Sequence, residues 1–319
     1  GSAYGLAKTH EFVVEFHPAG LESSELHRMA AAVQEPLHLR PSAEWVNETR
    51  VLGALASGEG GLQREEDQLL ERLLDWAARQ QVQSAWYGML NFGDTLSWHR
   101  KEADDKSYDH WGWHPEGRWG WFNCEAVGTH TGALLQYLRT GRWASFQFGE
   151  DLTRHIMDVD TVHYNTIAND PRLAAVMDDE YSRVGSMHRH NADHWGGRNE
   201  EASHTNVVGI LLYYYLTGDP RAHDVALEVG DFFLGEHITY SGHADIAPQR
   251  TIANVLWGDV WLYELTRDEA YLKGAVKWAH RLFDGQQAGG AWLETHDPWA
   301  RTWRGKEATL HMAMYTMPA

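Results

Sequence analysis

Three stretches of the chain repeat one pattern of apolar and polar positions. Each stretch closes a helix with an aromatic residue and Leu, turns through Thr-Gly or Thr-Arg-Asp, and then opens an amphipathic helix. The turn threonines are Thr140, Thr217 and Thr266, and the stretches cover residues 136–158, 214–234 and 263–284. Because the threonines are unequally spaced, the pattern predicts a repeated structure rather than a repeated sequence.

Apolar residues at helical spacing predict four further helices, over residues 62–80, 123–138, 199–216 and 250–264. Helical hairpins that follow one another along a chain are typical of an α/α toroid, in which inner and outer helices alternate around a funnel. An irregular helical bundle is the alternative. We predict a mainly α protein with an α/α toroid. The clear helices are too few for a complete ring, which favours an incomplete or partly irregular toroid.

The first 57 residues have a different pattern. Residues 8–18 alternate like a strand, residues 21–33 predict a short helix, and the Gly-rich residues 57–61 predict a linker. We therefore expect a lead-in with a strand and a short helix over residues 1–57, and the toroid over 58–319. Gly1-Ser2 resembles an expression scar, and both ends look cut from a longer protein. The native N-terminus and flanking domains are then missing, and the location in the cell stays open.

Composition and charge argue against several classes of protein. The 319 residues carry a formal net charge of −18, which argues against nucleic acid as a partner. No apolar run is long enough to predict a membrane span. The single cysteine, Cys124, excludes an intramolecular disulfide and a cysteine-rich zinc site. The sequence leaves the oligomeric state open.

Tryptophan is abundant, with 16 residues, and its positions fall into two groups. Those on apolar helical periodicity predict core positions: Trp76, Trp261 and Trp278. Those among Gly, His, Asp and Asn are candidates for a cleft, where an aromatic ring can carry the apolar face of a sugar: Trp86, Trp98, Trp111, Trp113, Trp119, Trp121 and Trp195.

Residues 185–206 form the most informative segment, because histidine, arginine, asparagine and acidic side chains crowd beside a tryptophan and paired glycines. A core segment cannot satisfy so many polar groups without dedicated partners, so we predict a polar cavity wall. Its candidate catalytic residues are His190, His194, His204, Glu200 and Glu201. Its candidate substrate-binding residues are Arg189, Arg198, Asn199 and Trp195.

The two glutamates have a second interpretation. Asn199 can cap the helix predicted to start there, and Glu200 and Glu201 in its first turn suit the helix dipole. On that helix Glu200 and His204 are four residues apart, so the carboxylate can orient the imidazole ring and raise its basicity.

A second cluster lies between Arg154 and His163, where a helix is expected to end. It contains His155, Asp158, Asp160 and His163. Asp160 and His163 have the chemistry to ligate calcium or zinc, although nothing in the spacing requires a metal. The alternatives are that the cluster lines the pocket or braces the histidine segment, or that it is an ion-pair network without function.

A third cluster joins residues 86–94 to residues 118–130, where aromatic residues alternate with polar ones. We expect a sugar-binding wall that includes Asp94, Trp121, Asn123 and Glu125, with Tyr164 as a pocket tyrosine. Helix capping by Asn123 and Glu125 is the alternative. A Gly-rich phosphate loop, a nucleophile elbow and a dinucleotide fingerprint are absent from the sequence, so we expect no required cofactor.

The chain contains, in order, the motifs WYGMLNFGD, RWGWFNCE, YLRTGR, TRHIMDVDTVHY, HRHNADHWGG with NEE and SH, and YYYLTGD. In this order the motifs resemble the central α/α-toroid domain of the exo-rhamnogalacturonan lyase-like (YetA-like) family. The opening YGLAKTHEFVVEF is similar to the lead-in of that domain. The resemblance extends from about residue 4 to 284. It implies polysaccharide breakdown, with β domains on both sides of the toroid, and it transfers no catalytic residue.

The first functional hypothesis is a polysaccharide lyase that cleaves a uronic-acid-containing, rhamnogalacturonan-like chain by β-elimination. Arg198, Arg189 or Asn199 would neutralise the uronate carboxylate. His194 or His204 would act as the base, and His190 or Tyr164 as the acid.

Three other hypotheses stay open. A glycoside hydrolase on the same glycans would pair Glu200 or Glu201 with Asp94, Glu125 or Asp160. A sugar isomerase or epimerase would use paired histidines. A carbohydrate-binding domain without catalysis would use the tryptophans. An acidic polysaccharide or oligosaccharide is the expected partner, and we expect no membrane association.

Overall fold

The computed structural model describes the chain in segments. They are residues 6–35, 37, 39, 41–53, 55, 61–83, 85, 87–88, 92–93, 95–96, 121–122, 128–164, 184–187, 202, 205–235, 248–297 and 302–307.

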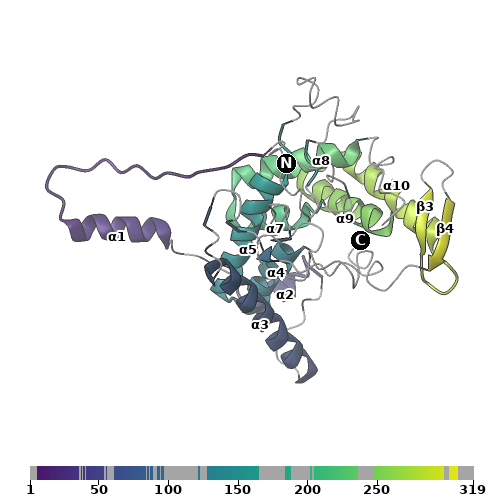
Figure 1. Ribbon diagram of the computed structural model, residues 1–319, viewed down its shortest axis with the longest axis horizontal. Helices are drawn as coiled ribbons and strands as arrows, with labels where there is room; N and C mark the ends of the chain where they lie inside the picture. The colour runs from purple at the N-terminus through teal and green to yellow at the C-terminus, as the bar shows by residue number, and fades with distance from the viewer. Residues whose placement is uncertain are drawn as a thin grey trace, which may run out of the picture.

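The body of the protein is built from helix hairpins (Figure 1). The helices are α4 (Thr129–Thr140) with α5 (Trp143–His155), α7 (Val208–Thr217) with α8 (Pro220–Leu234), and α9 (Pro248–Thr266) with α10 (Glu269–Gly285). Each pair is joined by a two-residue turn, so its helices are antiparallel neighbours. α7 packs against α4, α5, α8 and α9. The hairpin repeat predicted from the sequence is confirmed.

The three turn threonines make the same bonds in each hairpin. Each hydroxyl donates to the carbonyl four residues earlier and accepts from the backbone N–H two residues later, as Thr217 does with Tyr213 and Asp219. Asp219 and Asp268 then cap the following helices by accepting from Arg221 N and Ala270 N. The repeat in the sequence therefore encodes a repeated helix stop and helix start.

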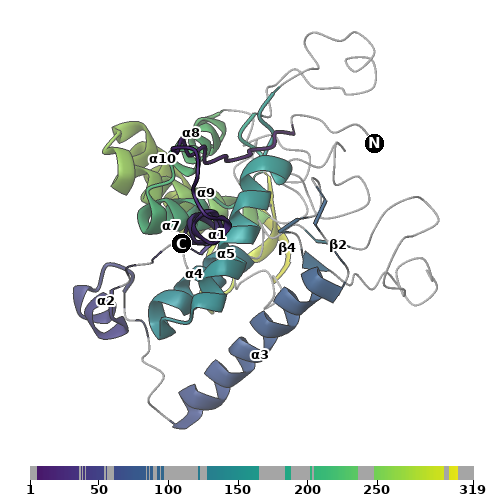
Figure 2. The ribbon, with the colours of Figure 1, turned by 90° about the vertical axis from the view of Figure 1, so that its left-hand side faces the viewer.

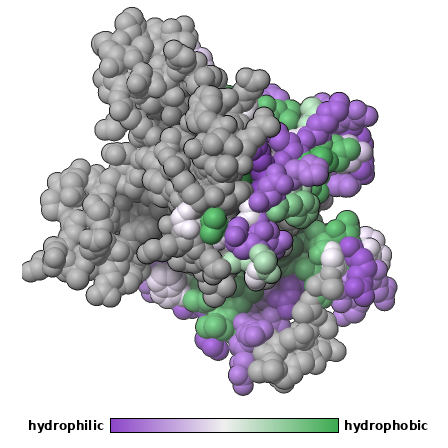
Figure 3. Space-filling model, turned by 90° about the vertical axis from the view of Figure 1, so that its right-hand side faces the viewer, coloured by the Kyte–Doolittle hydropathy of each residue, from purple (hydrophilic) through white to green (hydrophobic). Residues whose placement is uncertain are grey.

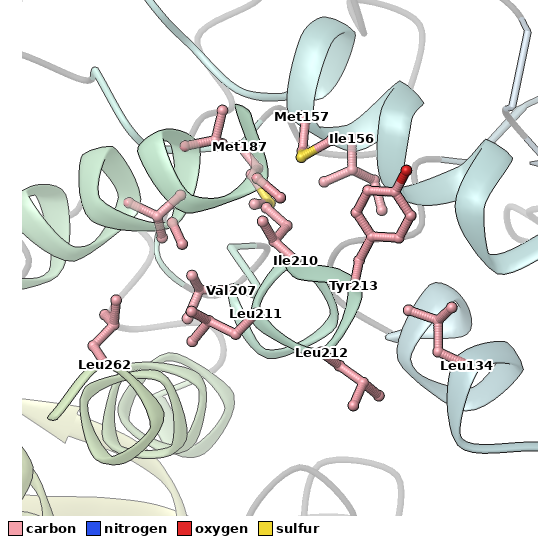
Figure 4. Close-up of a cluster of buried hydrophobic side chains, with 14 of the residues drawn as sticks. Leu134, Ile156, Met157, Met187, Val207, Ile210, Leu211, Leu212, Tyr213 and Leu262 are labelled. Atoms are coloured by element: carbon pink, nitrogen blue, oxygen red, sulfur yellow. The ribbon is translucent and has the colours of Figure 1, made fainter. Parts of the chain in front are cut away.

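Apolar side chains from several helices share one core (Figure 4). α7 lies at its centre, because residues 208–213 are all buried. Ile156 and Met157 follow α5, Met187 comes from the short described segment 184–187, and Leu262 comes from α9. Burial of its first six residues on all sides fits the inner layer of a helical-hairpin fold.

The lead-in is the least packed part of the described chain (Figures 1 and 2). The predicted short helix is confirmed as α1 (Ser23–Gln34), which stands away from the body and has no buried residue. A further helix, α2 (Ala43–Thr49), packs against α4. The predicted strand over residues 8–18 is wrong. These residues form no strand, and Phe12 and Phe16 are 84% and 91% exposed. An alternating pattern does not form a strand unless another strand pairs with it.

Strands occur elsewhere in the described chain. β1 (Thr95–Leu96) pairs with β2 (Trp121–Phe122), and β3 (Leu293–Asp297) pairs with β4 (Thr302–Glu307), both antiparallel. The first pair joins two of the stretches expected to form the sugar-binding wall. The second forms a hairpin that contacts α9.

Helix boundaries differ from the sequence predictions in places. The helices predicted over 62–80 and 250–264 are confirmed within α3 (Gly61–Gln83) and α9. The helix predicted from residue 123 begins at Thr129, after Gly128 in the left-handed region. Of the helix predicted over 199–216, the structure describes α7 from Val208; residues 205–207 are not helical, and the side chain of Asn206 accepts from Val208 N. The proposed cap at Asn199 and the four-residue spacing of Glu200 and His204 lie outside the described residues and stay predictions.

The tryptophans predicted to be core residues have different exposures. Trp278 is buried and Trp261 is half-buried against the core, as expected. Trp76 is 41% exposed, so its assignment to the core is wrong. The tryptophans predicted for a cleft lie outside the residues whose side chains the structure describes. No described helix is both long and apolar enough to cross a membrane.

Candidate functional site

Most candidate site residues lie outside the described residues or have undescribed side chains. These are Asp94, Trp121, Asn123, Glu125, Arg189, His190, His194, Trp195, Arg198, Asn199, Glu200, Glu201 and His204. The structure describes the second cluster, His155, Asp158, Asp160 and His163, and also Tyr164. It also describes the residues that flank each undescribed stretch, and the site is built from these.

A π-helical turn, Ile156–Asp160, continues α5 and is buried throughout. Such turns are rare and are frequent at functional sites. Asp160 Oδ1 lies 3.5 Å from Nε2 of His155, and His155 Nδ1 donates to the carbonyl of Phe92 over 3.0 Å. His155 is 1% exposed and Asp160 is fully buried. The expectation that a helix ends within this cluster is confirmed, and the π turn brings His155 and Asp160 together.

His130, near the start of α4, adds a third buried ionisable group. It is fully buried, and within the described structure neither ring nitrogen has a hydrogen-bond partner. Burial lowers the pKa of His130 to about 3, and the nearby Asp160 carboxylate opposes this shift only in part. His130 is therefore a neutral imidazole that faces a carboxylate inside the protein.

The ring of His130 packs directly on the backbone of α7 at Gly209. A Cβ at this position would overlap the ring, and it would lie 2.6 Å from the hydroxyl of Thr131. Gly209 thus permits the starts of α4 and α7 to approach closely. The residues just before the two helices are also close to each other, since a Cβ on Gly128 would lie 3.1 Å from Nδ2 of Asn206.

This close approach gives a testable prediction. Gly209→Ala should destabilise the fold by about 1–3 kcal/mol or more, because the methyl group has no space beside His130. Gly132→Ala in α4 is the matched control, since a Cβ there meets no atom within 4 Å and should stabilise by about 0.5–1 kcal/mol. Urea unfolding measures both. Equal stability of the two variants would contradict the contact between the helix starts.

The described flanks of the histidine-rich segment also meet this cluster. Val162 N donates to Ser186 O, Gly185 N donates to Val162 O, and Thr161 pairs with Met187 in an antiparallel bridge. Met187 N donates to the hydroxyl of Thr205 over 3.0 Å. The two ends of the segment are therefore bonded to one another, and its first end is bonded to the chain that follows the π turn.

The residues just before Asp94 also contact the cluster around His155. Phe92 bonds to His155, and the backbone of Gly93 packs against Asp151 and His155. The described ends of the three predicted clusters therefore converge at the N-terminal ends of α4 and α7. The starts of α4 and α7 favour negatively charged groups and the C-terminal end of α5 beside them favours positively charged groups, each by about 0.3–1 kcal/mol.

The other members of the second cluster lie in a separate network. His163 Nδ1 donates to Glu228 Oε2 over 2.5 Å, and its Nε2 lies near Met157 O and 3.1 Å from Nη2 of Arg221. Asp158 accepts from the backbone N–H and the hydroxyl of Thr9, which ties the lead-in to the π turn. Tyr164 is 58% exposed.

The two residues considered for metal binding therefore have different neighbours. Asp160 lies beside His155, whereas His163 contacts Glu228, Met157 and Arg221. Among the residues that the structure describes, no group of three or more His, Cys, Asp or Glu side chains could hold a metal ion.

His130 is the residue that sequence analysis left without a role. The sequence feature that could have indicated a role for His130 is its position at the end of the RWGWFNCEAVGTH stretch, seven residues after Asn123. Only the packing of α4 on α7 shows that it is buried, neutral and near Asp160.

Comparison with known proteins agrees with this architecture. Residues 36–233 match the family model described as the PcRGLX-like protein C-terminal alpha/alpha toroid domain. The chain is also 27% identical over 286 residues to the uncharacterized protein YetA of Bacillus subtilis (strain 168). That alignment covers 84% of this chain and 30% of the relative, so the chain spans less than a third of the relative's length. The family model covers more than half of the chain and describes the helical-hairpin fold seen here, so the chain belongs to the PcRGLX-like family and is mainly an α/α toroid.

Proposed function

We propose that the protein is a polysaccharide lyase that cleaves a uronic-acid-containing chain by β-elimination. The observation that carries the proposal is the convergence of the candidate segments' described flanks on the buried His130, His155 and Asp160 at the starts of α4 and α7. Membership of a rhamnogalacturonan lyase-like toroid family supports a polysaccharide as the substrate.

The reaction begins by neutralising the uronate carboxylate, which makes the C5 proton acidic. We assign this role to Arg189, Arg198 or Asn199. His194 or His204 then takes the C5 proton. The C4–O4 bond breaks as the C4=C5 double bond forms, and His190 or Tyr164 protonates the departing O4. The reaction as written needs no metal ion.

The buried cluster supports this chemistry indirectly. His155 lies 3.5 Å from Asp160, the Asp160 carboxylate also acts on His130, and burial keeps His130 neutral. A rigid, mostly buried floor can hold the catalytic histidines in a fixed orientation, which general base catalysis requires. His163, through Glu228 and Arg221, holds the chain just beyond the π turn.

The product distinguishes this proposal from hydrolysis. We expect incubation with pectic and other uronic-acid polymers to release a 4,5-unsaturated uronate, which absorbs ultraviolet light. An active protein that releases only saturated sugars would contradict elimination and favour a hydrolase with a carboxylate pair. Parallel reactions with EDTA, calcium and zinc test whether a cation contributes.

A further inference from the structure

A large pocket lies between the helical body and the lead-in, with much of its lining on the later turns of the inner helices. Its volume is about 1340 Å³, and it is lined by the later turns of α4 and α7, by α9, by Phe146, Glu150 and Arg154 of α5, and by the lead-in around α2. Since α7 has 10 residues, roughly 15 Å separates its two ends. The pocket extends along α5 as far as Arg154, but His130, His155 and Asp160 are not among its described lining residues.

We propose that this pocket binds a neutral oligosaccharide. The inference does not depend on the reaction, because it rests on the side chains and charges of the pocket itself. The pocket exceeds the roughly 300–1,000 Å³ that is usual for a single small ligand, so it has space for several linked sugar rings.

Aromatic rings supply the apolar faces that such a ligand needs. Trp45 on α2 is 59% exposed and Tyr215 on α7 is 49% exposed, and both line the pocket. Tyr215 lies 6.3 Å from Trp261, and Trp257 is one helical turn before Trp261 on α9. The C–H face of a sugar ring is apolar and can pack on such rings. Figure 3 shows another face of the molecule, on which hydrophobic and hydrophilic residues of the described chain lie side by side.

The charged residues of the pocket select against an acidic ligand. Its described lining includes the carboxylates Glu11, Glu150, Asp219 and Glu264, and Arg154 is the only cation among these lining residues. Arg154 is already engaged, because it contacts Glu11 over 2.5 Å and Glu150 over 3.8 Å. A uronate chain would therefore be repelled, whereas the hydroxyls of a neutral sugar can donate to carboxylate oxygens.

The same charges argue against a second copy of this chain as the occupant. Each copy carries a formal net charge of −18, so an acidic pocket would face an acidic partner. A neutral glycan avoids this repulsion and uses both the aromatic and the acceptor groups.

The test measures binding of neutral and acidic oligosaccharides to the 319-residue protein by isothermal titration calorimetry. The neutral probes are galactotetraose, cellotetraose and mannotetraose, and the acidic probe is trigalacturonate. We expect saturable binding of at least one neutral probe and weaker binding of trigalacturonate. Trp45→Ala and Tyr215→Ala should each lower the affinity for the neutral probe by roughly tenfold, which corresponds to about 1.4 kcal/mol of binding free energy.

Matched controls remove exposed aromatic rings outside the pocket lining. Trp76→Ala is the control for Trp45→Ala, and Tyr87→Ala is the control for Tyr215→Ala, since these rings are 41% and 61% exposed. Glu264→Lys adds a second readout, because reversing one charge should improve the binding of trigalacturonate. Thermal unfolding followed by circular dichroism verifies that each variant is folded.

Several outcomes would overturn the proposal. They are no saturable binding of any neutral probe, tighter binding of trigalacturonate than of the neutral probes, or equal losses in the pocket and control variants. Sedimentation that shows a dimer, dissociated by Trp45→Ala, would instead assign the pocket to a second copy. These results leave the ultraviolet assay unaffected, so failure of one proposal is distinguishable from failure of the other.

Discussion

Replacement of His194 or His204 by alanine should lower turnover by roughly two to four orders of magnitude, the usual effect of removing a positioned acid or base. The protein should remain folded, because the proposal places both histidines at the wall of a cavity and not in the packed core. Steady-state kinetics on the uronic-acid polymer, followed by ultraviolet absorbance, measures the change. Far-ultraviolet circular dichroism verifies the fold.

Glu200→Gln provides the comparison for this prediction. If the reaction is elimination, Glu200→Gln should lower turnover less than either histidine change, because the glutamate would only orient an imidazole ring. Under hydrolysis the order reverses, since the carboxylate becomes essential. If Glu200→Gln abolishes turnover while both histidine variants stay active, the proposed roles are wrong.

Asp259→Asn should remove a large pH dependence of stability. Asp259 lies on α9 against Gly274 of α10, is fully buried, and within the described structure neither carboxylate oxygen has a hydrogen-bond partner. Burial raises the pKa of Asp259 to about 8, and Lys277 opposes this shift only partly. The folded protein then holds a proton that the unfolded chain releases near pH 4.

The sign of this effect follows from the raised pKa. The stability from protonated Asp259 is fully present below about pH 4 and is lost as the pH rises to about 8, by up to about 1.4 kcal/mol per pH unit. Asn keeps the shape and carries no charge, so Asp259→Asn should unfold in urea with a smaller slope and should be the more stable protein at about pH 8.

The control for this measurement is Asp224→Asn, whose side chain is 75% exposed on α8. It should keep the pH slope of the parent protein. If Asp259→Asn and the parent lose stability in parallel between about pH 5 and about pH 8, then ionisation of Asp259 does not lower the stability of the folded protein, and the prediction is wrong.

The hairpins were predictable because their signals are local. A threonine hydroxyl that bonds within its own turn, and an aspartate that caps the next helix, act between residues two to four positions apart. Such contacts form wherever the turn forms, so Thr140, Thr217 and Thr266 predicted three real helix junctions. The amphipathic α8 and α10 were predictable for the same reason, because one face of each helix meets the core.

Predictions that needed a distant partner failed or were incomplete. Residues 8–18 have a strand pattern, but no strand of the described chain pairs with them, and Trp76 has helical spacing but is 41% exposed. His130 was visible in the sequence as one polar residue among many. It became a buried neutral imidazole beside Asp160 only because Gly209 lets α7 pack on its ring.

By itself, the sequence determined the helical hairpins, the family and the clustering of polar residues, since all three are properties of neighbouring residues. Tertiary structure decided that helix α7 starts at Val208, that His155 pairs with Asp160 through the π turn, and that the flanks of the three polar clusters meet. It also decided that Asp259 is enclosed between α9 and α10. Burial and the pKa shifts that follow from it depend on which distant helices exclude water, and no local pattern of residues specifies that.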